Sequence, residues 1–300
     1  MDESLPSQPA LTPKVTAILI AHNQAGELRR AIEALERSEH REQLEILVVD
    51  CASQDGTASL ADEFPAIVMQ RLPHHFGATK ALNIATRTAR TDYLLLLSPD
   101  VEVAPNLAAR LAEHLESASD TIAVCPLLVD SEGAPASRHL QPLPDRESLA
   151  RVCAGGEAPR LTPEPALEGV AVPYPGREAL LVRKQFISGM NYFDERFGEY
   201  WADADLAMKI RQAGKKIRLY PEIQATWHAA HKPLPSGPLH TSDRILGAAT
   251  LLSKYDGFLA GLRFRWAAIL KALIHFDFPL FTALMSGRKL GSEAQKSRPT

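Results

Sequence analysis

The sequence predicts an α/β protein in which a doubly wound, mostly parallel sheet is flanked by helices and followed by a helical C-terminal extension. Three short apolar runs, at residues 15–21, 45–50 and 93–97, are rich in Val, Ile and Leu, as strands buried on both faces are. Stretches with helical spacing lie between them, and strands that alternate with helices are typical of this fold class. Each run is followed by polar residues, at the edge where such sheets bind ligands.

The elements of the N-terminal half follow in order. The first run, VTAILIA, leads into a predicted helix at 26–37, in which Leu28, Ile32 and Leu35 share one apolar stripe. The second run, EILVVD, ends in a turn, and the third run is the tyrosine and four leucines of YLLLL. Between the second and third runs the sequence predicts a short helix at 59–64, a strand at 67–72 and a helix at 78–89.

The following segment, residues 126–176, is less regular. It holds many prolines and few long apolar runs, which indicates irregular structure. Either a flap over the site or a tolerated surface insertion fits this pattern. After it the sequence predicts strands at 179–182 and 216–220, a helix at 203–214 that Gly214 ends, and helices from 242 onward.

Composition narrows the function classes. The 300 residues carry a formal net charge of −3, so nothing suggests a protein held on nucleic acid by positive charge. The three cysteines form no CxxC pair, and the polar start has no signal peptide, which fits a reducing cytoplasm. The sequence contains no GxGxxG after a strand and no P-loop lysine motif. Asp50 and Asp55 are too far apart for a phosphatase of the haloacid-dehalogenase type.

The pattern divides the chain into a disordered tail at 1–14, a sheet domain at 15–232 and a helical extension at 233–300. No run of 18 uncharged apolar residues predicts a membrane span. Residues 258–300 combine apolar and aromatic residues with seven Lys/Arg and only two Asp/Glu. Amphipathic helices of this composition would suit an anionic membrane surface. Alternatively, they pack on the sheet domain or form a dimer interface.

Polar side chains stand at three predicted strand ends, where His22, Asp50 and Asp100 follow apolar runs. Because the carboxyl ends of parallel strands share one edge of the sheet, we expect these residues along the same rim. A single acid after a strand usually marks a turn or a helix cap. Three polar strand ends in register indicate a ligand site.

Five blocks of sequence support a more specific interpretation. They are VTAILIAHN, VVDCASQDGT, FGATKALNIATRTARTDYLLLLSPDV, FDERFGEYWADADLAMKIRQAG and ATWH. In this order, over roughly residues 15–231, they resemble family 2 glycosyltransferases, and the LSPDV form is most similar to the rhamnosyltransferase-like branch. The resemblance implies a GT-A fold over 15–232. It also implies inverting transfer of a hexosyl or deoxyhexosyl group from a UDP- or dTDP-sugar.

The resemblance also implies an acceptor and a location. The acceptor would be a hydroxyl of a glycan or of a lipid-linked molecule in the synthesis of bacterial cell-surface polysaccharide. The protein would be cytoplasmic, either free or peripheral on the inner face of the cell membrane. No nucleic acid is implied.

The nucleotide side of the implied site comes from the first two blocks. Asp50 and Asp55 would accept hydrogen bonds from a uracil or thymine N–H or from a ribose hydroxyl. For Asp55, turn chemistry with Gly56 is the alternative. Asn23 and the backbone around Ala21 would flank the base.

The third block borders the nucleotide and its diphosphate. Lys80 would neutralise phosphate charge, or else be a solvated helix lysine. Asn83 lies one helical turn further along. Ser98 stands where the family's fuller acid-x-acid pattern has its first acid, and it would hold a water or a ribose.

Asp100 is the expected ligand of a divalent cation, Mg²⁺ or Mn²⁺, which would stabilise the departing diphosphate as a Lewis acid. Such cations take few protein carboxylates and keep waters and substrate phosphates as further ligands. His228 in ATWH is the expected second protein ligand, with His231 as a competitor and a buried structural histidine as the alternative.

Asp203 is the expected catalytic base, because inverting transfer needs a carboxylate that takes the proton of the acceptor hydroxyl. A helix N-cap is the competing role. Trp201 and Asp205 are expected on the acceptor side, although Trp201 also suits the core and Asp205 also suits an ion pair in the helix. Ala202 replaces the acid that precedes Asp203 in the family's motif. Together with Ser98 it motivates a second hypothesis, a catalytically impaired nucleotide-sugar-binding or scaffold protein.

Overall fold

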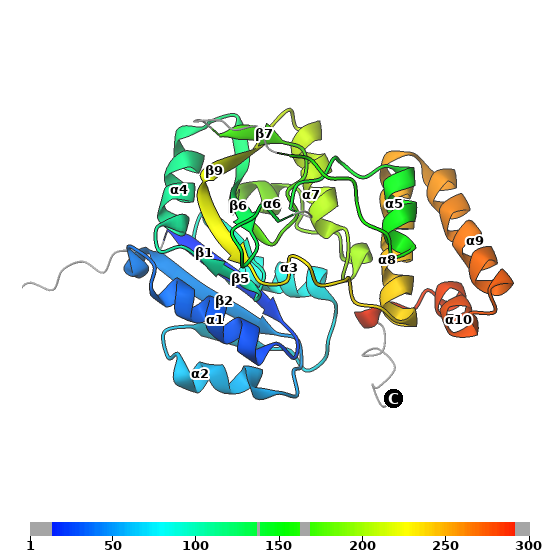
Figure 1. Cartoon of the computed structure of the whole chain (residues 1–300), viewed down its shortest axis with the longest axis horizontal. Helices are drawn as coiled ribbons and strands as arrows, with labels where there is room; N and C mark the ends of the chain where they lie inside the picture. The colour runs from blue at the N-terminus through cyan, green and yellow to red at the C-terminus, as the bar shows by residue number, and fades with distance from the viewer. Residues whose placement is uncertain (1–13, 137–138, 163–168, 292–300) are drawn as a thin grey trace, which may run out of the picture.

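The chain forms one large sheet with helices on both faces (Figure 1). This computed structural model describes residues 14–136, 139–162 and 169–291, so the predicted tail at 1–14 lies outside the described residues except for Lys14. Within them, nine strands pair in the order β3-β2-β1-β4-β8-β6-β9-β5, and β7 joins β9 beside that path. The strands are β1 Val15–Ala21, β2 Leu44–Asp50, β3 Val68–Arg71, β4 Tyr93–Leu97, β5 Val101–Val103, β6 Thr121–Val129, β7 Val170–Val172, β8 Ala179–Arg183 and β9 Lys216–Trp227.

The first four strands confirm the prediction of parallel pairing. β2 and β4 both pair with β1 in parallel, and β3 pairs with β2 in parallel. The register sets Ala21 beside Asp50, so the carboxyl ends of β1 and β2 lie at one edge, which we call the rim. Strand order reverses around β1, and such a switch point is where open α/β sheets bind ligands.

The second half adds antiparallel pairs to the sheet, which is therefore mixed. β8 lies between β4 and β6 and runs antiparallel to both. After β6 the chain passes through α5 and β7, which pairs with residues near the start of β9, and it returns to the rim before it enters β8. Glu178, directly before β8, therefore lies at the rim, where its carbonyl oxygen accepts from the Ser98 amide at 2.8 Å.

The predicted irregular segment contains more structure than expected. β6 continues to Val129, and a helix and a short strand follow within 146–172. The helix begins with a capping box in which Asp145 and Ser148 exchange side-chain and backbone hydrogen bonds. Residues 137–138 and 163–168 of this segment lie outside the described part of the chain.

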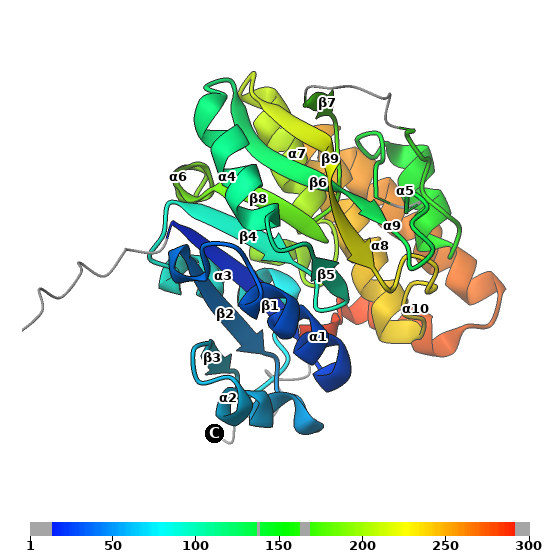
Figure 2. The same ribbon diagram turned by 60° about the vertical axis from the view of Figure 1, so that its left-hand side comes forward.

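Helices cover the two faces of the sheet (Figures 1 and 2). Because neighbouring strand residues point to opposite faces, Ile18 joins one core while Ala17 and Leu19 join the other. The helices are α1 Ala25–Glu36, α2 Leu60–Glu63, α3 Ala78–Thr88, α4 Leu107–Ser117, α5 Arg146–Cys153, α6 Lys184–Gly189, α7 Ala202–Gln212, α8 Pro238–Tyr255, α9 Phe258–Ile274 and α10 Phe278–Ser286.

The three C-terminal helices differ in their packing. Leu246 and Leu252 of α8 belong to the same core as α3 and α7, so α8 is an integral part of the sheet's covering layer. α9 and α10 lie beyond α8, away from the sheet (Figure 1). None of the helices in the described residues combines the length and apolarity needed to cross a bilayer.

Candidate active site

The rim at β1 and β2 is closed by local hydrogen bonds. Asn23 lies in the left-handed region at φ 53°. Its backbone amide donates to the Ser53 hydroxyl at 2.9 Å, and its side-chain oxygen accepts from the Gln54 backbone amide at 2.8 Å. The imidazole of His22 lies 2.8 Å from the carbonyl oxygen of Cys51. These bonds tie the turn after β1 to the turn after β2.

Both predicted nucleotide acids take part in these turns. Asp50 is fully buried, and its carboxylate accepts from the Ser53 amide at 2.9 Å. Asp55 accepts from the amides of Thr57 at 2.9 Å and Ala25 at 3.0 Å. Although desolvation opposes it, these bonds and the Thr57 hydroxyl hold the pKa of Asp55 below its usual value. Asp55 thus has the turn role considered as the alternative, and contact of either acid with a nucleotide stays a prediction.

The two residues predicted from α3 have structural partners. The Asn83 amide is buried, accepts from the backbone amide of Phe193 at 2.9 Å and donates to its carbonyl at 2.9 Å. Contact with a nucleotide would require breaking these bonds, so we leave Asn83 out of the proposed site. The Lys80 ammonium lies 4.3 Å from the ring centre of Phe76, and its phosphate role stays a prediction.

Asp100 lies on the turn between β4 and β5. One of its carboxylate oxygens, Oδ1, is buried and has no hydrogen-bond partner among the described residues. Leaving a buried carboxylate oxygen unpaired is costly, and a hard cation is a partner that would satisfy it. The residue therefore fits the predicted divalent metal. Within 14–136, 139–162 and 169–291, no cluster of three or more His, Cys, Asp or Glu side chains is arranged for a metal.

His228 follows β9 beside Asp100, as predicted, but its ring is used differently. Its backbone amide donates to the Asp100 carbonyl at 2.9 Å, which fixes the two residues side by side. However, its Nε2 lies 3.1 Å from the Glu102 carboxylate. A cation bound by His228 would therefore take Nδ1, with Glu102 holding Nε2, or else displace Glu102 from Nε2. The competitor His231 pairs with Asp130 at 2.9 Å.

Asp203 lies half-buried in the first turn of α7. The helix cap is Trp201, so Asp203 is not the N-cap residue considered as its competing role. Its Oδ2 accepts from the Tyr174 hydroxyl at 2.8 Å. Burial and the nearby Asp203 charge raise the pKa of Tyr174, which keeps the phenol protonated as a donor. One oxygen of Asp203 is thus fixed, and the carboxylate retains acceptor capacity for a second hydroxyl.

Sequence reasoning missed Glu178, which belongs to the same group of acids. Burial first, and then the charges of Asp203 and Asp100, raise its pKa to about 7, while Arg177 opposes the shift. Asp100 and Asp203 thus act on one carboxyl group, although they are far apart in the chain. The available sequence signal was its position, because Glu178 is the charged residue directly before the apolar run at 179–182.

The two predicted acceptor-side residues are buried. Asp205 is 1% exposed and binds the Lys254 ammonium at 2.6 Å and the Tyr255 hydroxyl at 2.8 Å, which ties α7 to α8. The Trp201 indole donates to the Arg244 carbonyl at 3.0 Å within the core. The structure thus gives both residues the structural roles considered as alternatives, and we leave them out of the proposed site.

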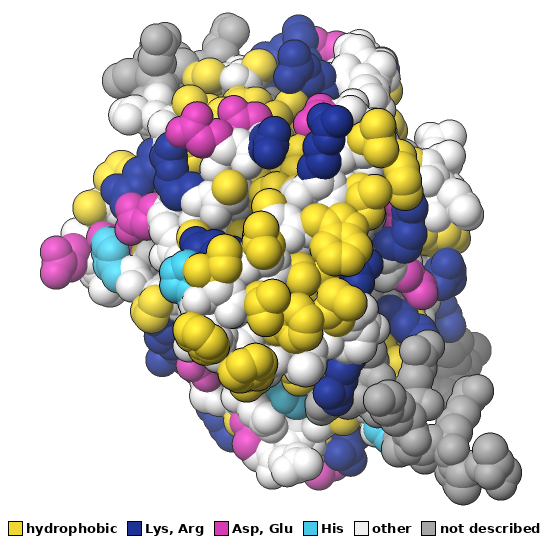
Figure 3. Space-filling view, turned by 90° about the vertical axis from the view of Figure 1, so that its right-hand side faces the viewer, with side chains coloured by type: hydrophobic (Ala, Val, Ile, Leu, Met, Phe, Trp, Pro, Cys, Tyr) yellow, Lys and Arg dark blue, Asp and Glu magenta, His cyan; other side chains and the backbone are white. Residues whose placement is uncertain are grey.

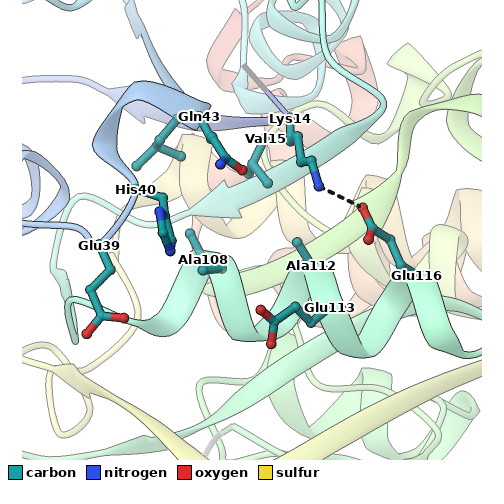
Figure 4. A pocket seen from close by; sticks show the side chains of 11 residues that line it. Lys14, Val15, Glu39, His40, Gln43, Ala108, Ala112, Glu113 and Glu116 are labelled. Carbon is teal, nitrogen blue, oxygen red and sulfur yellow. Dashed lines mark ion pairs between the residues drawn. The ribbon is translucent and has the colours of Figure 1, made fainter. Parts of the chain in front are cut away.

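A shallow pocket lies elsewhere on the molecule (Figure 4). It is lined by residues at the starts of β1 and β2, including Val15 and Leu44, and by one side of α4. Figure 4 marks one ion pair between its lining residues, which joins Lys14 and Glu116 at 3.9 Å. Because it lies at the opposite edge from the strand ends, it takes no part in the chemistry of the rim.

The fold is an α/β domain with polar strand ends at the switch point of its sheet, the place where sheets of this class bind ligands such as nucleotides. Residues 16–164 match the family described as glycosyl transferase family 2. This part of the chain is thus a glycosyl transferase family 2 domain.

Two curated relatives carry related names. Over 285 residues the chain is 23% identical to YfnE of Bacillus subtilis, an uncharacterized glycosyltransferase, with 81% of this chain and 71% of that protein covered. Over 114 residues it is 32% identical to the succinoglycan biosynthesis protein ExoO of Rhizobium meliloti, with 37% of this chain and 32% of that protein covered.

Solved structures share the fold. GalNAc-T7 with UDP, GalNAc and Mn²⁺ superposes with a TM-score of 0.61 at 15% identity, with 93% of this chain and 57% of that chain covered. S. aureus TarS superposes with a TM-score of 0.56 at 13% identity, with 80% of this chain and 40% of that chain covered. At these identities the likeness shows the fold alone, which is the GT-A fold. The chain spans less than two thirds of either structure.

Proposed function

We propose that this protein transfers a sugar, with inversion, from a nucleotide-diphosphate sugar to an acceptor hydroxyl, and that Asp203 is the catalytic base. One observation carries the proposal. Asp203 is held at one oxygen by Tyr174, Asp100 has a buried oxygen with no partner among the described residues, and the charges of both raise the pKa of Glu178 at the rim. A carboxylate available to a cation and an oriented base would together serve inverting transfer, because one supports the leaving group and the other takes the acceptor proton.

In the proposed step the acceptor oxygen attacks the anomeric carbon of the donor. The bond from acceptor oxygen to carbon forms, the bond from carbon to the diphosphate oxygen breaks, and the acceptor proton passes to the free oxygen of Asp203. Tyr174 keeps the other oxygen in place throughout. A divalent cation held by Asp100 would offset the charge on the departing nucleotide diphosphate.

We assign the nucleotide to the closed turns after β1 and β2, with UDP and dTDP as the candidates. Asp50 ends β2 in a rigid setting, because its carboxylate is fixed by the Ser53 amide and faces Arg71 Nε at 3.4 Å. Neighbours that carry UDP and UDP-GlcNAc in their descriptions share this fold, which supports a uridine donor.

The acceptor we propose is a glycan or lipid-linked hydroxyl in the synthesis of a bacterial surface polysaccharide. The description of one relative as a succinoglycan biosynthesis protein supports this role. A lipid-linked acceptor would place the reaction next to a membrane.

The outer face of α9 supports peripheral attachment to an anionic membrane. Figure 3 shows hydrophobic side chains gathered on the side of the molecule where α9 and α10 lie. Trp266 is 55% exposed and Leu270 56%, and Arg263 and Lys271 are exposed on the same helix. Aromatic and aliphatic side chains beside cations suit the boundary of an anionic leaflet.

Vesicle sedimentation tests the attachment. We expect binding to vesicles that contain phosphatidylglycerol, and a loss of at least tenfold in the double variant Trp266→Glu, Leu270→Glu. Val68→Glu, an exposed apolar position on β3, is the matched control. Equal binding by the double variant would contradict the proposal, and a dimer that the double variant dissociates would assign the face to a second copy instead.

Turnover with a panel of UDP- and dTDP-sugars in Mg²⁺ or Mn²⁺ tests the function. We expect donor hydrolysis or transfer with at least one donor. Calorimetry with UDP and dTDP on the same samples separates the alternatives. Nucleotide binding without turnover of any donor would favour the scaffold protein that Ala202 and Ser98 motivate.

A further inference from the structure

Glu178 is an acid that the proposed mechanism does not use, and its place in the sheet is fixed. Its carbonyl oxygen accepts from the Ser98 amide at 2.8 Å, across from the strand that leads to Asp100. Its side chain folds against Gly176, where a Cβ atom would lie 2.1 Å from Glu178 Oε2. Gly176 has a positive φ of 73°, a backbone conformation that favours glycine. The Glu178 carboxylate thus lies against Gly176, shortly before β8.

The surroundings of this carboxylate are unfavourable to its charge. After burial, the charge of Asp203 is the largest contribution that raises its pKa, and the charge of Asp100 contributes less. The carboxyl group is thus under the stronger influence of the base and the weaker influence of the predicted cation ligand. Arg177 offsets this repulsion only in part, because its guanidinium also faces the Glu199 carboxylate at 3.8 Å.

A purely structural acid would have a different environment. Asp205 shows what one looks like here, since a lysine and a tyrosine bind it directly. No side-chain hydrogen bond to the Glu178 carboxylate is found in the described residues. Two half-buried carboxyl groups held near each other cost stability unless a ligand donates hydrogen bonds to them. A polyol is such a ligand.

We propose that Glu178 is a specificity-determining residue that accepts a hydrogen bond from a hydroxyl of the donor sugar. The inference rests on the proposed function, in which the transferred sugar must lie between the cation at Asp100 and the base at Asp203. Glu178 is the chain's own acid at that place. A site that hydrogen-bonds a hydroxyl discriminates strongly against sugars that lack it or present it in the other configuration.

Calorimetric titration with UDP, UDP-glucose, UDP-galactose and UDP-GlcNAc, and with the dTDP series, measures the effect without turnover. Each is titrated with Mn²⁺ into the wild type, Glu178→Gln and Glu178→Ala. Glu113→Gln on α4, at the far edge of the sheet, is the control for loss of an exposed carboxylate. Thermal unfolding of the Gln variant, which keeps the size of the side chain, checks its folding.

We expect Glu178→Ala to lose about tenfold or more in affinity for the preferred nucleotide sugar, while its affinity for the free nucleotide stays within twofold. Glu178→Gln should change the ranking of the glucose and galactose epimers. Unchanged ratios of nucleotide-sugar to nucleotide affinity in both variants would overturn this inference and leave the proposed function intact. A wild type that binds no nucleotide would overturn both.

Discussion

The acids at the two ends of the rim are in opposite states. At β1 and β2, Asp50 and Asp55 receive hydrogen bonds from backbone amides. At β4, β8 and α7, one oxygen of Asp100 is buried without a partner in the described residues, and burial with nearby negative charge raises the pKa of Glu178. We call the β1–β2 end closed, because its acids have hydrogen-bond donors within the protein. We call the other end open, because its acids lack donors or a cation among the described residues.

The difference teaches which end carries the chemistry. Closed turns preserve the shape of a binding surface at little electrostatic cost. Acids held near one another cost folding free energy, and such costs concentrate at functional sites. The comparison predicts that substitutions at the open end change turnover or binding, whereas substitutions at the closed end mainly change stability.

The largest expected effect is at the base. Asp203→Asn should lower kcat by about 10²–10⁴-fold, because the acceptor proton would lose its carboxylate. Affinity for UDP or dTDP should stay unchanged in calorimetry. Asp62→Asn, an exposed acid on α2, is the control. Full transfer by the Asn variant would exclude Asp203 as the base, and would contradict the conclusion that the open end carries the chemistry.

The sequence predicts the elements of the N-terminal half of the sheet better than those of the second half. Buried strands at β1, β2 and β4 could be predicted because both faces are covered, so their apolar runs are nearly continuous. β6 and α4 were not assigned, and α5 was hidden in a proline-rich segment whose helix depends on a local capping box. The direction of β8 could not be read from its five residues, because it depends on the path of the chain through α5 and β7 back to the rim.

The positions of the site residues along the rim could be predicted from the sequence, but the contacts of their side chains could not. Strand ends placed Asp50, Asp100 and His228 along one rim, since strand register follows from pairing. Whether the His228 ring faces Asp100 or Glu102 depends on rotamers that only packing decides. Tyr174 reaches Asp203 from a distant segment, and periodicity carries no signal for such a contact.

A further acid on α8, Asp243, has a buried carboxylate oxygen without a hydrogen-bond partner among the described residues. Asp243 is fully buried, and burial raises its pKa to about 6, although Lys289 and the Glu199 amide oppose the shift. Because its folded pKa exceeds its unfolded value, the folded state binds more protons between about pH 4 and pH 6. Its contribution to stability therefore falls as pH rises through that window, and the penalty is fully present above it.

Asp243→Asn should remove this penalty. The variant should be more stable than the wild type at pH 7.5, by up to about 3 kcal/mol, and nearly equal to it at pH 4. Asn retains an oxygen that can accept from the Glu199 amide, which Asp243 binds at 3.2 Å. Urea unfolding at the two pH values measures the effect. A difference in unfolding free energy that does not depend on pH would mean that the charge of Asp243 does not destabilise the fold, as for the acids at the closed end.

The third prediction concerns the predicted cation. Asp100→Ala should reduce the affinity for UDP or dTDP in Mn²⁺ by about 10–100-fold, to the value measured with a chelator. The wild type should lose the same affinity when the chelator is added. An Ala variant that still responds to Mn²⁺ would show that the cation is held by other residues.

Tyr174→Phe should have a smaller effect on turnover. Loss of one hydrogen bond to a carboxylate corresponds to about a tenfold decrease in kcat, with KM for the donor unchanged. Tyr192→Phe, on the loop after α6, is the control. A loss of kcat in Tyr174→Phe that is accompanied by a marked fall in its unfolding temperature would mean that Tyr174 supports the fold rather than the base.

The smallest effect is expected at the closed end, where Asp55 separates the two roles considered for it. Asp55→Ala removes the acceptor for the Thr57 and Ala25 amides and should cost about 1 kcal/mol of folding free energy, the usual cost of losing a helix cap. Asp55→Ser restores a capping oxygen without the charge, so it should recover most of the stability.

If Asp55 belongs only to the scaffold, both variants bind UDP and dTDP as the wild type does, because the turn is fixed by further bonds from Asn23 and Ser53. Calorimetry that finds Asp55→Ser as stable as the wild type but more than tenfold weaker for the nucleotide would instead make Asp55 a binding residue. The closed end would then take part in recognition through the same carboxylate that caps its turn.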